Sequence, residues 1–298
     1  MKRKESKSRK IFNVFNYSFM ALFSLATLYP FWYVLICSFN EGRDFTKGGV
    51  WLWPRVFTLE NYELAFQDPR IFRSLCVSVF ITVTSVLINL AAASLVSYAF
   101  TVKNFPGKKF FTFFWYFTTL FGGGMIPYYL LLRRLGLTRS IWLYIIPNIY
   151  SFSDMILMRA NMQNIPNELR ESAQLDGASD RQVLTRIYLP LSKAILATLA
   201  LFIGVDQWNS WFAGAYYQTN TKLWPAATLL RELMSTAISA IEEGKTAHKL
   251  IEMEEMLTYT SQSLQMAFVM ILTMPIIVVY PFLQKYFVKG MLVGSVKG

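Results

Sequence analysis

Charged residues and histidine are scarce in this 298-residue chain, and both shortages narrow the possible functions. Only 16% of the residues are charged, whereas soluble globular proteins carry about 25%. Hydrophobic residues make up 54% of the chain, and its mean hydropathy is +0.35. His248 is the sole histidine, and neither CxxC nor HExxH occurs, which argues against a metalloenzyme. We therefore expect an integral membrane protein with no metal site and no catalytic residues.

Cysteine and nucleotide-binding glycines are equally sparse. Cys37 and Cys76 fall in different apolar stretches, and we interpret both as small buried hydrophobic residues. A GxxxxGK[ST] phosphate loop is missing, since Gly107-Lys108 lacks a glycine at the required distance before it. Several pairable carboxylates within the membrane, as in a proton relay, are missing too. A transporter built from this chain would need an energy source outside it.

The net charge of +11 does not indicate nucleic-acid binding, because the basic residues occupy short segments between long apolar runs. A spanning helix needs about 20 mostly apolar residues. Six stretches meet this requirement, so the predicted fold class is an all-α polytopic membrane protein with six transmembrane helices, at 13–38, 74–100, 110–132, 141–158, 191–213 and 263–284. The first is too long for a signal peptide and has no small-residue cleavage site, so we expect it to be retained.

Six crossings place both termini on one side of the membrane, and the basic tail Met1–Lys10 predicts that this side is the cytoplasm. Segments assigned inside carry seventeen Lys and Arg against five Asp and Glu, and those outside carry twelve against eleven. Arg133, Arg134 and Arg139 oppose the rule locally. We expect one transmembrane domain, 1–298, with a cytoplasmic loop at 159–190 and an extracytoplasmic loop at 214–262. The outer loop should be partly helical, with Leu229, Leu230, Leu233 and Ile238 on one side.

Several predicted spans carry polar or helix-breaking residues. The second has a stripe of small residues at helical spacing, which favours close helix packing: Ser78, Thr82, Ser85, Asn89 and Ala92. The fourth should face the bundle interior or a cavity with Asn148, Ser151, Ser153 and Asp154. Gly122-Gly123-Gly124 and Pro127 interrupt the third, and Pro275 and Pro281 lie in the sixth. For any single one of these residues, ordinary helix packing is the simpler explanation.

The segment Ile165–Pro190 predicts two short helices with a sharp joint. Pro166 suits a helix start, Glu168 and Glu171 favour the positive end of its dipole, and Gly177 can end it in the left-handed conformation. Ser179 and Gln182 form a capping-box pattern for the second helix, whose apolar side holds Val183, Leu184 and Ile187. We expect a compact projection on the cytoplasmic side, although a simple connecting loop is the alternative.

The spacing Glu-x-Ala-x-x-x-Gly, nine residues, then Ile-x-Leu-Pro resembles the signature loop of binding-protein-dependent ABC importer permeases. Glu171-Ser172-Ala173 differs from the common Glu-Ala-Ala by one small residue. The resemblance implies the ABC importer permease fold and a coupling helix seated in a cleft of a separate ATPase subunit. The residues it assigns to this coupling are Glu168, Glu171, Ala173, Asp176, Gly177, Ala178, Ile187, Leu189 and Pro190.

Two further segments resemble carbohydrate-class permeases. The stretch Asp206–Phe212 looks like the Trp-Asn end of their fifth span, and 280–298 is similar to the tail of the maltose-type second permease, in particular its polysaccharide-fragment subgroup. For a substrate path we single out Asp206, Trp208, Asn209 and Trp211. Their aromatic rings could stack on sugars, but Trp also gathers at membrane interfaces for other reasons.

The resemblance implies a prokaryotic cytoplasmic-membrane importer of oligosaccharides or polysaccharide fragments, working by alternating access. Its implied partners are a homologous second permease, two ATPase subunits that bind ATP and Mg²⁺, an extracytoplasmic solute-binding protein, the carbohydrate and membrane lipid. The chain itself would be no enzyme and would bind no cofactor. Two alternatives are a membrane-embedded lipid or glycan transferase, for which clustered interfacial Asp, Glu or His are missing, and a structural or sensory subunit.

Overall fold

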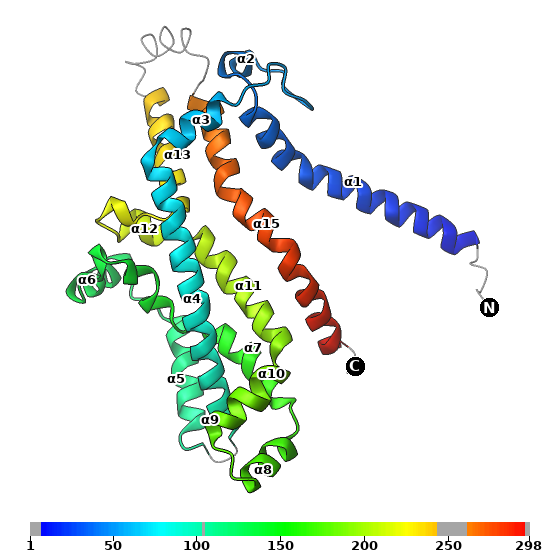
Figure 1. The fold of residues 1–298 in the computed structure, drawn as a ribbon, viewed down its shortest axis with the longest axis vertical. Coiled ribbons are helices and arrows are strands. Elements are labelled where there is room, and N and C mark those ends of the chain that lie inside the picture. Colours follow the sequence, from blue (N-terminus) through cyan, green and yellow to red (C-terminus); the bar gives the residue numbers. More distant parts are fainter. Residues whose placement is uncertain (1–6, 103–104, 243–260, 296–298) are drawn as a thin grey trace. The chain divides into compact units, whose positions relative to one another are not determined.

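The computed structural model describes residues 7–102, 105–242 and 261–295 (Figure 1). Within these ranges the chain is helical, as predicted, and its extended backbone pairs at one isolated bridge between Asn40 and Phe57. Contacts divide the chain into two compact units, Met1–Asp68 with Leu233–Thr273 and Pro69–Glu232 with Met274–Gly298. Each unit is described by itself, and the single domain 1–298 stays a prediction.

The first unit contains α1 (Lys7–Ser38), α2 (Gly42–Thr46), α3 (Glu60–Gln67) and the beginning of α15 (Ser261–Ser295). Most large apolar side chains of α1 are exposed, which fits a helix surrounded by lipid. Beyond α1, the buried Asn61 amide donates to the carbonyls of Ser38 and Asn40, at 3.0 Å each. Ser263 donates to its oxygen at 2.9 Å. These bonds satisfy the polar backbone where the helix ends.

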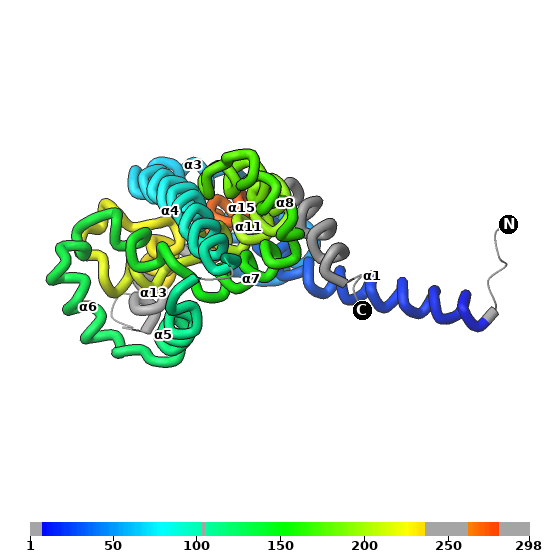
Figure 2. The backbone as a smooth tube through the Cα atoms, turned by 90° about the horizontal axis from the view of Figure 1, so that it is seen from below, coloured from blue at the N-terminus to red at the C-terminus, as the bar shows by residue number. Residues whose placement is uncertain are grey.

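The second unit is built around α4 (Pro69–Thr101), against which α7 (Phe152–Gln163) and α11 (Lys193–Asn209) pack (Figure 2). Three members of the predicted small-residue stripe are buried, namely Ser78, Ser85 and Asn89. A methyl group added to Gly204 of α11 would meet Val86 of α4 at 3.6 Å, so the two backbones approach closely. The stripe therefore packs helix on helix, as small residues do within membranes.

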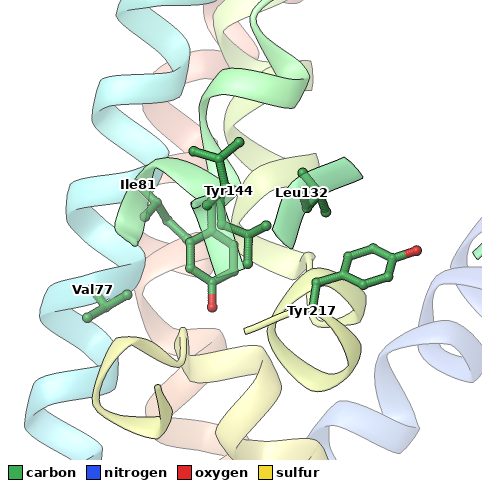
Figure 3. Packing of buried hydrophobic residues seen from close by; sticks show 7 residues of the cluster. Val77, Ile81, Leu132, Tyr144 and Tyr217 are labelled. Atoms are coloured by element: carbon green, nitrogen blue, oxygen red, sulfur yellow. The ribbon is translucent and has the colours of Figure 1, made fainter. Parts of the chain in front are cut away.

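An apolar cluster joins α4 to the segments before α7. Val77 and Ile81 of α4 belong to one cluster with Leu132 of α6 (Met125–Arg134), Tyr144 of η2 (Ile141–Tyr144) and Tyr217 (Figure 3). The Tyr144 hydroxyl donates to the Leu223 carbonyl at 3.0 Å, which gives the buried phenol a partner. This cluster holds the 137–144 turns on the same helix that carries the small-residue stripe.

Among the described residues, three helices are long and apolar enough to cross a membrane, and up to five segments qualify if each of two bent helix pairs counts as one span. The three are Ser8–Ser38, Pro69–Thr101 and Gln262–Val279, and the pairs join Ile141–Asn148 to Phe152–Gln163 and Asp180–Leu191 to Lys193–Tyr216. The predicted interruption of the 110–132 span is confirmed: α5 (Lys108–Leu120) ends before the three glycines, and α6 begins after Gly124. Gly124 has φ of +83°, which breaks an α-helix.

The predictions for the two cysteines and for the outer loop have different outcomes. Cys37 is buried as expected, but Cys76 is exposed on α4, because it lies on the side opposite the packed stripe. The outer loop is partly helical as predicted, with α12 (Phe212–Tyr216), η5 (Thr221–Leu223) and α13 (Ala226–Glu242). Leu229 is buried there, and Leu230 and Leu233 are half-buried. Several earlier predictions concern residues that the structure does not describe: the Ile238 side chain, the segment 243–260 with His248, and the tail Met1–Ser6.

Candidate functional site

The 165–190 segment folds as two helices joined at a glycine, as the sequence predicts. Helix α8 spans Asn167–Leu175, and Gly177 follows in the left-handed conformation with φ of +81°. The amide of Ala178 donates to the Ala173 carbonyl at 2.9 Å, and the Gly177 amide donates to Gln174 at 3.1 Å. This pair of bonds is the Schellman ending that favours glycine.

The second helix has the predicted cap. Helix α9 (Asp180–Val183) starts after Ser179, whose hydroxyl accepts from the Gln182 amide while its own amide donates to Gln182 Oε1 at 2.8 Å. A π-helical turn, Leu184–Tyr188, and α10 (Leu189–Leu191) continue it. The chain then bends by 81° before α11, at the buried Ser192 rather than at Pro190. Local capping thus makes the whole segment a defined body rather than a loose loop.

Side-chain contacts fasten this body to α4. The Tyr98 hydroxyl donates to the Asp180 carboxylate at 2.8 Å, and its ring stands edge-on to Tyr188 with centroids 5.1 Å apart. Arg170 reaches the same carboxylate at 3.3 Å and covers the Tyr98 ring, 5.5 Å from its centroid. Gln174 adds a bond to Asp180 at 3.3 Å. One carboxylate therefore links α8, α9 and the end of α4.

The nine residues assigned to coupling divide into two groups by burial. Four pack against the apolar cluster around Tyr98, Met158 and Tyr188, namely Ala173, Ala178, Ile187 and Leu189. The other five are exposed, namely Glu168, Glu171, Asp176, Gly177 and Pro190. The four partly buried residues hold the segment on the bundle, and the exposed five are accessible to another molecule.

The outer side of this segment has an unusual apolar exposure. Leu175 at the end of α8 is 90% exposed, although leucine is a residue that folding normally buries. Beside it the joint forms a cavity of about 380 Å³, lined by Ala173, Asp176, Gly177, Ala178, Gln182, Val183, Arg186 and Ile187. A protruding leucine next to a hollow that carries both charges is suited to contact with a protein partner.

A second hollow lies within the helix bundle. It is a cavity of about 300 Å³ between α4, α7 and α11, lined mainly by polar groups: Asn89, Asn148, Tyr150, Ser151, Asp154, Phe202, Ile203, Asp206 and Gln207. The Asn89 amide donates to the Ser85 carbonyl at 2.8 Å, and Gln207 donates to the Tyr144 carbonyl at 3.4 Å. The prediction that the fourth span turns polar residues toward a cavity is confirmed for Asn148, Ser151 and Asp154.

The structure does not bring the four predicted substrate-path residues together. Asp206 lines the polar cavity, but Trp208 lines a separate apolar cavity of about 410 Å³ with Pro275 of α15. The Asn209 amide donates to the Val205 carbonyl at 2.9 Å. Trp211 packs on the guanidinium of Arg231, 3.7 Å from its ring centroid. Sequence reasoning missed Tyr150 and Gln207, which periodicity alone could not assign to the polar cavity.

Within the described residues, the fold does not bring candidate metal ligands together. Across the described ranges, no three His, Cys, Asp or Glu side chains gather closely enough to hold a metal ion. What the geometry offers instead is a capped projection with an exposed leucine beside a hollow, and a polar cavity in an apolar helix bundle.

Comparisons with known proteins were made at three levels, and no model of a protein family matches the chain. The chain is 36% identical to protein LplC of Bacillus subtilis strain 168, over 98% of this chain and 97% of that protein. It is 35% identical to the polygalacturonan/rhamnogalacturonan transport system permease protein YtcP of the same strain, over 97% and 99%. It is 25% identical to the arabinooligosaccharides transport system permease protein AraQ of Halalkalibacterium halodurans, over 100% of both.

Two solved structures that share this fold are also carbohydrate ABC transporters. The chain is similar to a chain of a bacterial ABC transporter involved in the import of the acidic polysaccharide alginate, with a TM-score of 0.84 and 29% identity. The match covers 96% of this chain and 99% of that one. A second alginate ABC transporter structure, in complex with an alginate pentasaccharide-bound periplasmic protein, shares the fold at a TM-score of 0.55 and 16% identity.

Proposed function

The chain belongs to the permease subunits of carbohydrate ABC importers, and we propose from this premise that it forms half of the membrane channel in such a complex. It is a membrane protein and not itself an enzyme, since its relatives are permeases whose partner ATPases hydrolyse ATP. We propose six spans with both termini in the cytoplasm. In this arrangement α5 and α6 together make the third crossing, which the three glycines interrupt.

The observation that carries the coupling assignment is the 165–190 segment. Its helices are capped, its joint is set by Gly177, and its buried residues tie it to α4, α7 and α11. A load applied to α8 is therefore transmitted to the bundle rather than absorbed by a flexible loop. We propose that α8 is the coupling helix and that the exposed Leu175 enters a cleft on an ATPase subunit. Glu168, Glu171, Asp176 and Gly177 would line that contact.

The proposed complex contains this chain, a homologous second permease, two ATPase subunits and an extracytoplasmic solute-binding protein. ATP and Mg²⁺ would bind on the ATPase subunits, and no cofactor would bind this chain. We place the complex in the cytoplasmic membrane of a prokaryote. The basic character of the segments assigned inside supports this orientation, because Lys and Arg are retained on the cytoplasmic side.

The proposed cargo is an oligosaccharide or a fragment of a polysaccharide. The names of the relatives support it, since they specify polygalacturonan, rhamnogalacturonan, arabinooligosaccharides and alginate. The polar cavity between α4, α7 and α11 is the part of this chain best suited to line the path, because its amides, hydroxyls and carboxylates can exchange hydrogen bonds with sugar hydroxyls. Asp206 belongs to that cavity; Trp208, Asn209 and Trp211 would contribute only if transport rearranges them.

Isolation of the chain with its partners tests the function. We expect it to co-purify with a second permease and an ATPase subunit, and the ATPase of the complex to rise when a sugar-loaded binding protein is added. A complex that survives detergent yet contains no ATPase subunit would overturn the proposal. A complex whose ATPase ignores every sugar-loaded binding protein would contradict the importer assignment while leaving the coupling helix in place.

A further inference from the structure

A cavity at the beginning of α4, here called the basic hollow, has a mostly cationic lining. It has a volume of about 370 Å³ and lies between the first turns of α4 and the 221–232 segment. Three basic side chains, one acidic side chain and a tryptophan are among its lining residues, which are Arg70, Arg73, Ser74, Thr221, Lys222, Trp224, Leu229 and Glu232. Neither Arg73 nor Lys222 forms an ion pair with a described residue. The lining therefore carries a positive charge that Glu232 offsets only in part.

Hydrogen bonds hold the 221–232 wall of the basic hollow in place. The buried Ser78 hydroxyl of α4 accepts from the Ala226 amide at 2.8 Å. The Leu223 carbonyl accepts from Tyr144, which is buried in the apolar cluster on α4, at 3.0 Å. The chain is thus fastened on both sides of Trp224. The basic hollow is for this reason a feature of the folded unit and not a chance arrangement of mobile surface side chains.

A second observation at the basic hollow points to a ligand. The indole Nε1 of Trp224 is buried, but it finds no hydrogen-bond acceptor among the described residues. Buried donors almost always have a partner in protein, water or ligand, so a donor without one calls for an explanation. Binding pockets for small molecules typically combine an aromatic wall with a few polar groups. Trp224 supplies the aromatic wall and a donor, and Arg73 and Lys222 supply the charge.

The position of the basic hollow suits the entry of a solute. Arg73 precedes Tyr98, which contacts the 165–190 segment, by 25 residues of α4, or about 38 Å along the helix axis. Figure 1 shows α8 and α9 at the other end of this long helix from its first residues. In the proposed orientation the basic hollow is therefore extracytoplasmic. Ser74 of its lining precedes Asn89 of the polar cavity by 15 residues, or about 22 Å along the same helix.

We propose that the basic hollow binds a carboxylate of an acidic oligosaccharide before the solute enters the membrane path. This deepens the proposed function, on which it rests for the identity of the solute as a carbohydrate. Arginine binds carboxylates through paired, charge-assisted hydrogen bonds. A cleft lined by one sign of charge also raises the local concentration of a ligand of opposite sign. A uronate offers its carboxylate to Arg73 and Lys222, and its hydroxyl oxygens are acceptors of the kind that Trp224 lacks.

Protection of a reporter cysteine tests the site. Thr221→Cys, at an exposed residue of the lining, is introduced in a Cys76→Ser background, while Cys37 is fully buried. The purified complex in phosphatidylcholine nanodiscs is treated with uncharged methyl methanethiosulfonate, and mass spectrometry of this chain gives the rate of modification. Trigalacturonate or galactotriose of the same linkage is added as the protecting sugar. We expect trigalacturonate to halve the rate at a concentration at least about tenfold lower than galactotriose.

Removing the basic groups should remove this preference. In Arg73→Gln with Lys222→Gln, the two protecting concentrations should come within about threefold of each other. Arg73→Gln alone should narrow the gap if the double variant assembles poorly. Arg134→Gln, at an exposed arginine of α6 outside the lining, is the matched control and should keep the full preference. Equal protection by both sugars, protection by neither, an unchanged gap in the double variant, or a reporter that the reagent never modifies would each overturn the proposal.

Anionic lipid is the other source of a negative group near this cavity, and a change of nanodisc separates it from the sugar. We expect the same modification rate without sugar when phosphatidylglycerol replaces half of the phosphatidylcholine. Slower modification with phosphatidylglycerol, restored in the Arg73 and Lys222 double variant, would assign the basic hollow to a lipid headgroup and refute the proposal.

The reporter rates need no ATP turnover, so the site and the proposed function can fail separately. Protection by trigalacturonate in a preparation that contains no ATPase subunit would support the site while the proposed function fails. Absence of protection in a complex whose ATPase responds to a sugar-loaded binding protein would refute the site alone.

Discussion

The hydroxyl of Tyr98, near the end of α4, donates a 2.8 Å hydrogen bond to the carboxylate of Asp180, the first residue of α9. The two residues are 82 positions apart in the sequence, so the bond connects the long central helix directly to the 165–190 segment. Arg170 closes the arrangement by contacting both residues. A displacement of α8 therefore reaches α4 through polar contacts as well as through apolar packing.

Tyr98→Phe removes this connection while keeping the ring and its contact with Tyr188. We expect a loss of about 1 kcal/mol in local stability, because Asp180 is largely exposed and water replaces part of the lost bond. Sugar-stimulated ATPase activity of the complex should fall a few-fold, with its basal activity retained. Tyr116→Phe is the matched control, since Tyr116 is an exposed tyrosine of α5. Equal stimulation in Tyr98→Phe and the control would show that the bond plays no part in coupling.

Gly177→Asp should abolish coupling without removing the protein from the membrane. Any side chain at φ of +81° costs about 1 kcal/mol, but no atom lies within 4 Å of an added Cβ, so the fold should survive. The new carboxylate would stand on the proposed ATPase-docking face, and uptake should drop by about tenfold or more.

Gly136→Asp is the control for that variant. Gly136 has φ of +70° and equally open surroundings, so the backbone cost is the same. Quantitative immunoblotting of membranes and a sugar-uptake assay compare the two variants. Normal uptake by Gly177→Asp, or equal loss in both, would count against the coupling-helix assignment.

Gly214→Ala should destabilise the second unit. A methyl group there would lie 2.9 Å from Cβ and Cγ2 of Thr228, whose hydroxyl is already bound to the Trp211 carbonyl at 3.0 Å. Overpacking of this kind costs about 1–3 kcal/mol, and we expect the melting temperature in detergent to fall by about 5 °C. Gly204→Ala, with its nearest neighbour at 3.6 Å, should melt at or above the wild-type temperature. The prediction fails if the two variants melt alike.

Asp44 gives the 39–57 loop a pH-dependent stability. Partial burial acts to raise the pKa of its carboxyl, but hydrogen bonds from Asn40 at 3.0 Å and Arg55 at 2.9 Å outweigh it and hold the pKa below its usual value. A lowered pKa in the folded state stabilises the loop above the unfolded-state pKa of about 3.9, and the gain is lost as the pH falls through the folded-state pKa.

Asp44→Asn should therefore lower the melting temperature at pH 7 and reduce its further fall on acidification. Differential scanning fluorimetry with tryptophan emission measures both, and Glu63→Gln, an exposed carboxylate of α3, serves as control. An identical acid profile for wild type and Asp44→Asn would contradict the role of this ion pair.

Local chemistry made the 165–190 segment predictable from the sequence. Gly177, Ser179 and Gln182 act within a few residues of each other, so their spacing determined the cap and the joint correctly. The small residues of the second span likewise predicted its packed side. Apolar length was less informative at 110–132, because three consecutive glycines end a helix whatever the surrounding hydropathy.

The substrate-path residues could not be predicted as well, because their grouping depends on tertiary contacts. On α11, Asp206 and Trp208 are two positions apart and point to nearly opposite sides of the helix, whereas Asn209 is three positions from Asp206 and lies on a neighbouring part of its side. One enters the polar cavity, one the apolar cavity, and one bonds its own helix. A run of sugar-compatible residues in a sequence therefore did not amount to a site, whereas Tyr150 and Gln207 joined it through contacts that only the tertiary structure creates.

The burial pattern of the coupling motif has a consequence for engineering. Because Ala173, Ala178, Ile187 and Leu189 pack in part against the bundle, grafting this motif whole onto another permease would bring in side chains fitted to a different bundle. Glu168, Glu171 and Asp176 are exposed, so their side chains are not fitted to the packing of this bundle. Pairing specificity should thus be transferable by exchanging the outward residues of α8 and of the joint after it, without altering the packing on the bundle.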